Sequence, residues 1–128
     1  GGLGAVHGLS QALGGIAHTP HGMTNAILLP KVMKYNCKGN PKKFAEIAEL
    51  LGADTVGMSY ERAAVEAVTM VEELNMRIGV PDSINTLGVT RDMFDDVVDG
   101  TMGYRLLWMN PIEFTKELAY KVLDESME

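Results

Sequence analysis

The sequence predicts an all-α domain, a helical bundle without a sheet. Glycine and proline residues divide it into segments of helical length, and in most segments apolar residues recur every three or four positions, as on a buried helix face. No segment alternates apolar and polar residues as a half-buried strand does. Residues 1–128 are therefore expected to form a single helical domain.

The first helix is expected over 3–16. Its core-facing stripe, spaced i, i+4 and i+7, is Leu9, Leu13 and Ile16. His7 and Gln11, four residues apart, share a different face of this helix.

The second helix is expected to open at Thr19, as N-cap, with Pro20 in the first helical position. Its middle, 23–29, is apolar nearly all round and is placed at the centre of the bundle. Pro30 is expected to bend or end it.

Two further helices have clear boundaries. The third starts at Asn40-Pro41 and ends before a left-handed cap at Gly52. Its apolar stripe is Phe44, Ile47, Ala48 and Leu51. The fourth runs over 59–78 and is stopped by Gly79 and Pro81. Its expected buried stripe is Ala67, Val71, Leu74 and Ile78.

After the fourth helix, 82–88 is turn-like. The rest of the C-terminal third should contain two further helices. One is capped by Thr90 and ends at Gly100. Its buried residues should be Phe94, Val97 and Val98. The last helix carries Phe114, Leu118 and Val122, and 101–110 shows no clear period.

The composition argues against several classes of function. With 46% apolar and 22% charged residues, the chain is typical of globular domains. The net charge is −6 and the basic residues are scattered, so nucleic-acid binding is not expected. The longest apolar run, 26–30, is far shorter than the ~20 residues of a membrane helix. The single cysteine, Cys37, allows no internal disulfide and is given no chemical role, and a cytoplasmic location is expected.

All three histidines, His7, His18 and His21, lie within the first 22 residues. Antiparallel packing of the first two helices would bring the imidazoles of His7 and His21 together, and imidazole is a common metal ligand. A catalytic metal usually takes three or four protein ligands, and no further ligand follows at a recognisable spacing. Spacing alone leaves two interpretations open: these histidines bind no metal, or they form half of a metal site. His21 also lies at a helix N-terminus, where anions bind.

Other conspicuous residues are given structural interpretations. The glycines of 1–4 and of 14–15 lack the strand and the spacing of a phosphate-binding loop and are interpreted as sites of close helix packing. Asp95, Asp96 and Asp99 are expected on a solvated helix face.

A specific pattern runs through 2–36, which reads GLGAVHGLSQALGGIAHTPHGMTNAILLPKVMKYN. Its elements, in chain order, are His7, Leu13-Gly14, Pro20-His21-Gly22, Asn25-Ala26 and Leu29-Pro30. The two histidines are 14 residues apart. This pattern closely resembles the signature of the iron-containing alcohol dehydrogenases, and weaker correspondences extend the resemblance over essentially the whole chain.

The resemblance implies a fold and a metal site. The chain would be a fragment, corresponding to the later part of the C-terminal helical domain of a two-domain dehydrogenase without its N-terminal nucleotide-binding domain. His7 and His21 would be metal ligands, and the other two ligands, an Asp and a His, would lie upstream. Fe²⁺ is the family's namesake metal, and Zn²⁺ suits the same ligands. NAD or NADP would bind mainly to the missing domain.

The activity implied by the resemblance is the interconversion of alcohols with aldehydes or ketones by hydride transfer to a nicotinamide, with the metal polarising the substrate oxygen. The partner would be a small alcohol or aldehyde, the full-length enzyme could form an oligomer, and the isolated chain would be inactive. The alternatives are a related glycerol dehydrogenase or dehydroquinate synthase, and a non-catalytic helical interaction domain.

Gln11 departs from the family pattern, because many members carry a histidine there that faces the nicotinamide and the substrate. Glutamine forms hydrogen bonds but does not titrate, so Gln11 is interpreted as a pocket-lining residue outside any proton relay. His18 stands where the family varies and is given no role.

Overall fold

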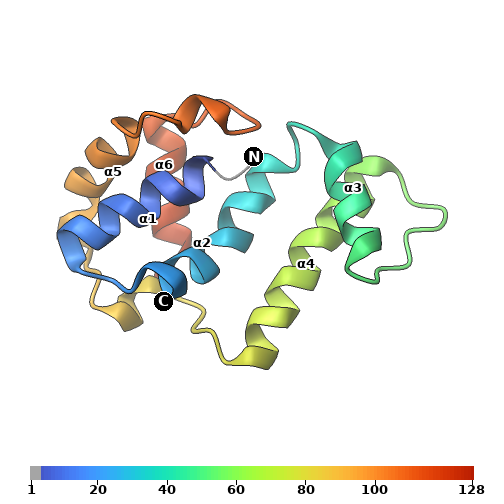
Figure 1. Ribbon diagram of the computed structural model, residues 1–128, viewed down its shortest axis with the longest axis horizontal. Helices are drawn as coiled ribbons and strands as arrows, with labels where there is room; N and C mark the ends of the chain where they lie inside the picture. Colours follow the sequence, from blue (N-terminus) through green and yellow to red (C-terminus); the bar gives the residue numbers. More distant parts are fainter. Residues whose placement is uncertain (1–3) are drawn as a thin grey trace.

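The computed structural model describes residues 4–128 (Figure 1). These residues form no strand, which confirms the all-α prediction. The α-helices are α1 (Gly4–Ala17), α2 (His21–Asn36), α3 (Pro41–Leu50), α4 (Tyr60–Ile78), α5 (Phe94–Met102) and α6 (Lys116–Glu125). Short 3₁₀ helices are η1 (Ile84–Leu87), η2 (Arg91–Met93) and η3 (Leu107–Met109). Leu3, the expected start of the first helix, lies outside the described residues. Across 4–128, none of the helices combines the length and apolarity needed to cross a membrane.

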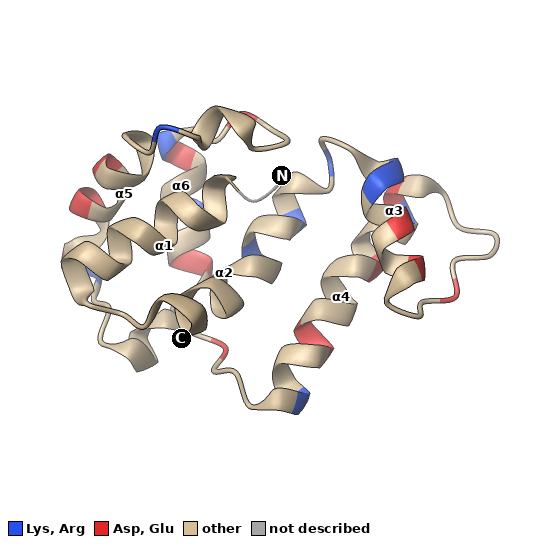
Figure 2. Cartoon of the chain, in the orientation of Figure 1, with Lys and Arg blue, Asp and Glu red and all other residues tan. Residues whose placement is uncertain are grey.

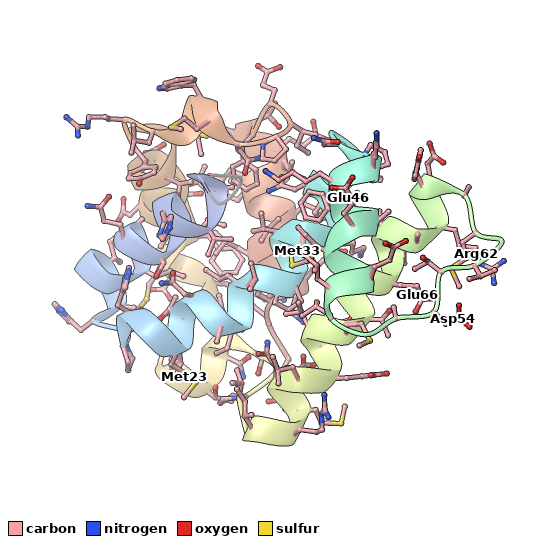
Figure 3. The ribbon with its side chains drawn as sticks, turned by 45° about the vertical axis from the view of Figure 1, so that its right-hand side comes forward. Met23, Met33, Glu46, Asp54, Arg62 and Glu66 are labelled. Carbon is pink, nitrogen blue, oxygen red and sulfur yellow. The ribbon has the colours of Figure 1, made fainter. Side chains whose placement is uncertain are left out.

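Two apolar clusters hold the helices together, and α2 belongs to both. The larger cluster joins α1, α2, α5 and α6, and the smaller joins the end of α2 to α3 and α4 (Figure 1). Ile27, Leu28 and Val32 lie in the larger cluster, and Met33 lies in the smaller one, between α2 and α3 (Figure 3). Leu29 packs against both. The central position predicted for the second helix is therefore observed.

The start of α2 differs from its prediction. Pro20 is extended, with ψ 126°, so the helix begins one residue later than expected and Pro20, not Thr19, precedes it. The hydroxyl of Thr24 donates to the Pro20 carbonyl at 2.7 Å, whereas the buried Thr19 hydroxyl has no hydrogen-bond partner within 4–128. Met23, expected at the centre, is exposed because no described element covers it (Figure 3).

Pro30 does not end α2, which continues to Asn36. Because proline has no N–H, the carbonyl of Ala26 one turn earlier loses its helical donor. Asn75 of α4 replaces this donor, with its Nδ2 atom 2.8 Å from the Ala26 oxygen. A side chain from another helix thus satisfies the carbonyl freed by the proline and links α4 to α2 at this point.

The buried face of α4 also differs from its prediction. Ala67 is buried as expected, but Val71 is only half-buried, and Leu74 and Ile78 are 43% and 66% exposed. The buried residues are Ala63, Ala64, Ala67 and Val68. The reason is length: α3 has 10 residues and α4 has 19, so α3 covers only part of α4 and leaves Leu74 and Ile78 uncovered.

Most helix ends follow the local signals in the sequence. The residues whose side chains accept a hydrogen bond at a helix start are Asn40, Ser59 and Thr115. Gly52 and Gly79 adopt the left-handed conformation, with φ 99° and 81°, as expected after a helix. Thr90 does not cap α5, because η2 intervenes and the Thr90 hydroxyl bonds to Asp92 instead.

The C-terminal helices complete the larger cluster. Phe94, Val97, Val98 and Val122 are buried as predicted. Phe114 is also buried, but it lies in the loop before α6 because the helix starts only after its cap at residue 115.

The first prediction concerns Pro30 and Asn75. Replacing Asn75 by Leu should lower the free energy of unfolding by about 1–2 kcal/mol, because the Ala26 carbonyl loses its donor. In a Pro30→Ala background the backbone N–H returns, so the same replacement should cost at most about half as much. Urea denaturation of the four proteins of this double-mutant cycle measures the coupling. Equal costs in both backgrounds would contradict this account of Pro30.

Candidate metal site

The structure brings His7 and His21 together. His7 lies in the second turn of α1, and His21 is the first residue of α2. Their rings are nearly parallel, with an interplanar angle of 15° and centroids 6.5 Å apart, and both residues are exposed. The predicted approach of the two imidazoles across the first two helices is therefore observed.

The distance between the rings decides whether one ion can join them. Nitrogen–metal bonds of ~2.1 Å keep the centroids of two imidazoles on one ion within roughly 6.5 Å, and tetrahedral geometry brings them to roughly 5 Å. The observed 6.5 Å is at the outer limit of this range. The observed separation matches only near-linear coordination, and a tetrahedral ion would need the rings roughly 1.5 Å closer. His7 is exposed, so rotation about its side-chain torsions changes this distance without moving a helix.

Close contacts with the 101–110 segment hold α1 in place. A Cβ atom on Gly4 would lie 2.9 Å from the carbonyl oxygen of Leu106, and one on Gly8 would lie 3.3 Å from the side chains of Thr101 and Tyr104. Glycine is required at Gly4, because the opposing atom belongs to the backbone. The turn of α1 that carries His7 therefore rests directly on this segment.

A buried pair of amides fixes the same end of α1. The side chains of Asn36 and Asn110 exchange two hydrogen bonds, of 2.9 and 2.8 Å. Asn110 Oδ1 also accepts from the backbone N–H of Ala5 at 3.2 Å, and its Nδ2 donates to the carbonyl of Ile112 at 3.0 Å. The end of α2 and the start of α1 are thus joined through one side chain.

Neither of the two helices places a charged side chain beside the histidine pair. α1 has no charged residue, and α2 has none before Lys31 (Figure 2). Within 4–128, no group of three or more His, Cys, Asp or Glu side chains is arranged to hold a metal ion. The described part of the chain therefore supplies two donors from this pair and no carboxylate beside them.

A hollow of about 260 Å³ adjoins His7. It is lined by Val6, His7, Asn25, Ala26 and Leu29. The Oδ1 atom of Asn25 is buried and has no hydrogen-bond partner among the described residues. A group entering this hollow would meet almost entirely apolar walls. Asn25 entered the sequence analysis only as part of the family pattern, and its position four residues after His21 places it on the same face of α2.

Another groove, of about 670 Å³, holds none of the candidate residues. It lies between α2, α3 and α4, with Met33, Phe44 and Val71 in its walls. Its lining is mostly apolar and includes no His, Cys, Asp or Glu, so it is not the centre of the candidate chemistry.

The other candidate residues lie apart from the pair. Gln11 is exposed on α1, four residues after His7, and its role as a pocket-lining residue stays a prediction. His18 is in the left-handed conformation, with φ 58°, in the turn between α1 and α2. Cys37 is buried, its thiol bonds to the Lys34 carbonyl, and burial raises its pKa.

One structural interpretation of the glycines is wrong. Gly14 and Gly15 do not mediate close packing: nothing lies within 4 Å of a Cβ on Gly15, and only the Thr19 carbonyl reaches 4.0 Å from one on Gly14. These two glycines lie in the last turns of α1, beyond its contact with the 101–110 segment. The acidic residues Asp95, Asp96 and Asp99 are all exposed on α5 as expected.

A second cluster of ionisable groups joins α2 to α6. The Tyr35 hydroxyl donates to Glu125, and the ammonium groups of Lys34, Lys38 and Lys121 lie 5.4–5.8 Å from the Tyr35 ring. Burial, followed by the bond to Glu125, raises the pKa of Tyr35 to about 12. The same hydrogen bond lowers the pKa of Glu125. At neutral pH this contact is a neutral phenol bonded to a carboxylate, which ties two helices together.

Comparison with known proteins identifies the family. A family model described as the C-terminal part of the Fe-containing alcohol dehydrogenase family matches residues 1–127. The chain belongs to this family.

Relatives among the iron-containing alcohol dehydrogenases are longer than this chain. The 1,3-propanediol dehydrogenase of Klebsiella pneumoniae is 47% identical over 87 residues, which are 68% of this chain and 22% of that protein. The lactaldehyde reductase of Escherichia coli K12 is 39% identical over 116 residues, 91% of this chain and 30% of that protein. A crystal structure of a 1,3-propanediol oxidoreductase superposes with a TM-score of 0.93 at 34% identity, over 96% of this chain and 32% of that one. The chain thus spans less than a third of the length of these relatives.

The second prediction tests the contact that places His7. Gly4→Ala should lower the free energy of unfolding by about 1–3 kcal/mol, because the new Cβ forces α1 away from the Leu106 carbonyl. Gly15→Ala is the matched control, a glycine in the same helix with open space around it. It should raise stability by about 0.5–1 kcal/mol through helix propensity alone. Chemical denaturation followed by circular dichroism measures both, and equal effects of the two replacements would refute the contact argument.

Proposed function

We propose that this chain is the metal-binding helical domain of an alcohol dehydrogenase, in which His7 and His21 supply two ligands of a divalent ion. The observation that carries this proposal is the pair of exposed, nearly parallel imidazoles on α1 and α2 in a member of this family. Fe²⁺ is the ion proposed from the family, and Zn²⁺ suits the same donors. When bound, the ion would polarise the oxygen of the alcohol or carbonyl substrate.

The chain's own contribution is to hold two donors in position before the ion arrives. Each imidazole is on a separate helix whose backbone is fixed by packing, so the backbone loses little conformational entropy when an ion binds. We propose that the remaining ligands, and the site for NAD or NADP, come from parts of the enzyme outside residues 4–128. On this proposal, the isolated chain does not oxidise alcohols.

The proposed substrate is a small alcohol or aldehyde. The relatives, a 1,3-propanediol dehydrogenase and a lactaldehyde reductase, favour this class over a synthase or a non-catalytic domain. The hollow beside His7 supports it, because apolar walls suit a short carbon chain. Gln11, four residues after His7, is proposed to bond to substrate or cofactor without transferring a proton.

The third prediction is that the chain binds Zn²⁺ weakly through the histidine pair. Two ligands give only part of the coordination free energy of a four-ligand site, so binding should be far weaker than in a complete site. His7→Ala and His21→Ala should each lower the association constant at least roughly tenfold, because one ligand remains. Isothermal titration calorimetry measures the change.

His18→Asn is the control for that titration. His18 is the third exposed histidine, and asparagine tolerates its left-handed backbone, so the fold should be kept. Zinc affinity should stay within about twofold of the original if the metal binds at the pair. Equal losses in all three variants would show nonspecific binding to surface imidazoles and would remove the support for the proposed site.

The fourth prediction concerns Gln11 in the full-length enzyme. Glutamine does not titrate near neutral pH, so Gln11→His would introduce a group that does, four residues from a metal ligand. The pH dependence of kcat should gain a new inflection between about pH 5 and 8. Gln11→Asn, which adds no titrating group, should leave the shape of the profile unchanged. Identical profiles for the histidine variant and the original enzyme would place Gln11 outside the proton path.

A further inference from the structure

Ser10 is a buried polar residue whose side chain is directed to the candidate site. It lies in the middle of α1 and is 1% exposed. Its Oγ atom is 3.3 Å from Nδ1 of His21, a contact between two helices. Ser10 and His7 are three residues apart on α1 and are therefore neighbours on the helix surface. Bonding of His21 to Ser10 thus holds the His21 ring beside His7.

The chemistry of the two partners determines which proton arrangement suits a metal ligand. A serine hydroxyl can donate or accept, and a neutral imidazole carries its proton on either nitrogen. If Nδ1–H donates to Ser10, Nε2 keeps a free lone pair. If Ser10 donates to Nδ1, the proton lies on Nε2, and that nitrogen cannot bind a cation. Only the first arrangement leaves Nε2 available for a metal.

The geometry points to Ser10 as the positioning residue that selects the Nδ1–H tautomer of His21 and directs its Nε2 atom toward an ion shared with His7. This inference rests on the proposed function, since it assumes that His21 is a ligand. Because Ser10 is buried, water competes weakly for its hydroxyl, so the bond persists in the folded chain. The side-chain entropy of the His21 ring is then lost during folding rather than during metal binding.

The direct test is the tautomer of His21 in the metal-free chain. Long-range ¹H–¹⁵N correlation spectra at about pH 8.5, well above the ordinary pKa of imidazole, distinguish the two protonated nitrogens. His21 is expected as the Nδ1–H form, whereas the exposed His18 serves as an internal reference. Ser10→Ala should move His21 toward the Nε2–H form that is usual for a free imidazole. A dominant Nε2–H form in the original chain overturns the proposal without any variant.

Zinc titration is the second readout. Ser10→Ala should weaken Zn²⁺ binding by about 10–100-fold, the usual effect of removing a hydrogen-bond partner of a metal ligand. Ser126→Ala is the matched control: Ser126 is a fully buried serine at the C-terminal end of α6, and its hydroxyl donates to the Val122 carbonyl. It removes the same atom but should leave both the His21 tautomer and the zinc affinity unchanged.

The outcomes separate this inference from the proposed function. Unchanged tautomer and unchanged affinity in Ser10→Ala overturn the role of Ser10 even if the histidine pair binds zinc. A chain that binds no zinc at His7 and His21 refutes the proposed function, and the tautomer shift still decides whether Ser10 orients His21. Equal losses of affinity in Ser10→Ala and Ser126→Ala would show that stability, rather than positioning, governs binding.

Discussion

The close approach of α1 to the backbone of the 101–110 segment is the constraint on which the candidate site depends. Gly4 and Gly8 permit this approach, and Asn110 fixes it by accepting from the N–H of Ala5. Leu106 and Asn110 belong to one short segment. If α1 slid along its axis, it would lose both the hydrogen bond to Asn110 and the close packing of Gly4 on the Leu106 carbonyl. These contacts therefore fix the position of His7 along the axis of α1 relative to His21.

The position of His21 depends on α2, and the missing N–H of Pro30 affects how α2 is held. The Ala26 carbonyl, freed by Pro30, is bonded by Asn75, so the middle of α2 is held to α4 while its first turns pack against α1. The smaller cluster therefore does more than extend the fold: it fixes α2 from the side opposite α1. His21, at the start of α2, is placed by packing on one face of the helix and by this hydrogen bond on another.

Periodicity and cap residues predicted the helices well because both depend on local geometry. The stripe of Leu9 and Leu13, and the caps at Asn40 and Gly52, needed no knowledge of distant contacts. The cap predicted at Thr90 fails because of the nearby Asp92, whereas the burial predicted for α4 fails where a distant partner decides. Whether Pro30 ends a helix depends on a donor 45 residues away, which no local pattern contains.

For the site, the sequence indicated His7 and His21 as donors, whereas Ser10 was not indicated and Asn25 was named only as part of the family pattern. A serine and an asparagine on amphipathic helices look ordinary until the packing shows which way they point. The contact of Ser10 with His21 exists only because α1 and α2 pack against each other, and the unpaired acceptor of Asn25 is apparent only from burial. Residues that orient a ligand are chosen by tertiary geometry, so sequence patterns recover the donors more readily than their supports.

The absence of charge around the histidine pair has a physical consequence for metal binding. Two neutral imidazoles do not compensate the charge of a divalent ion, and the first 30 residues carry no carboxylate. An ion held by this pair alone keeps most of its water and binds weakly, because the desolvation of its charge is not repaid by an anionic ligand. On the proposed function, an anionic ligand from elsewhere in the enzyme supplies that compensation. On that proposal, His7 and His21 form the uncharged half of the metal site. The affinity of the complete site for metal then depends on the segment that supplies the anionic ligand.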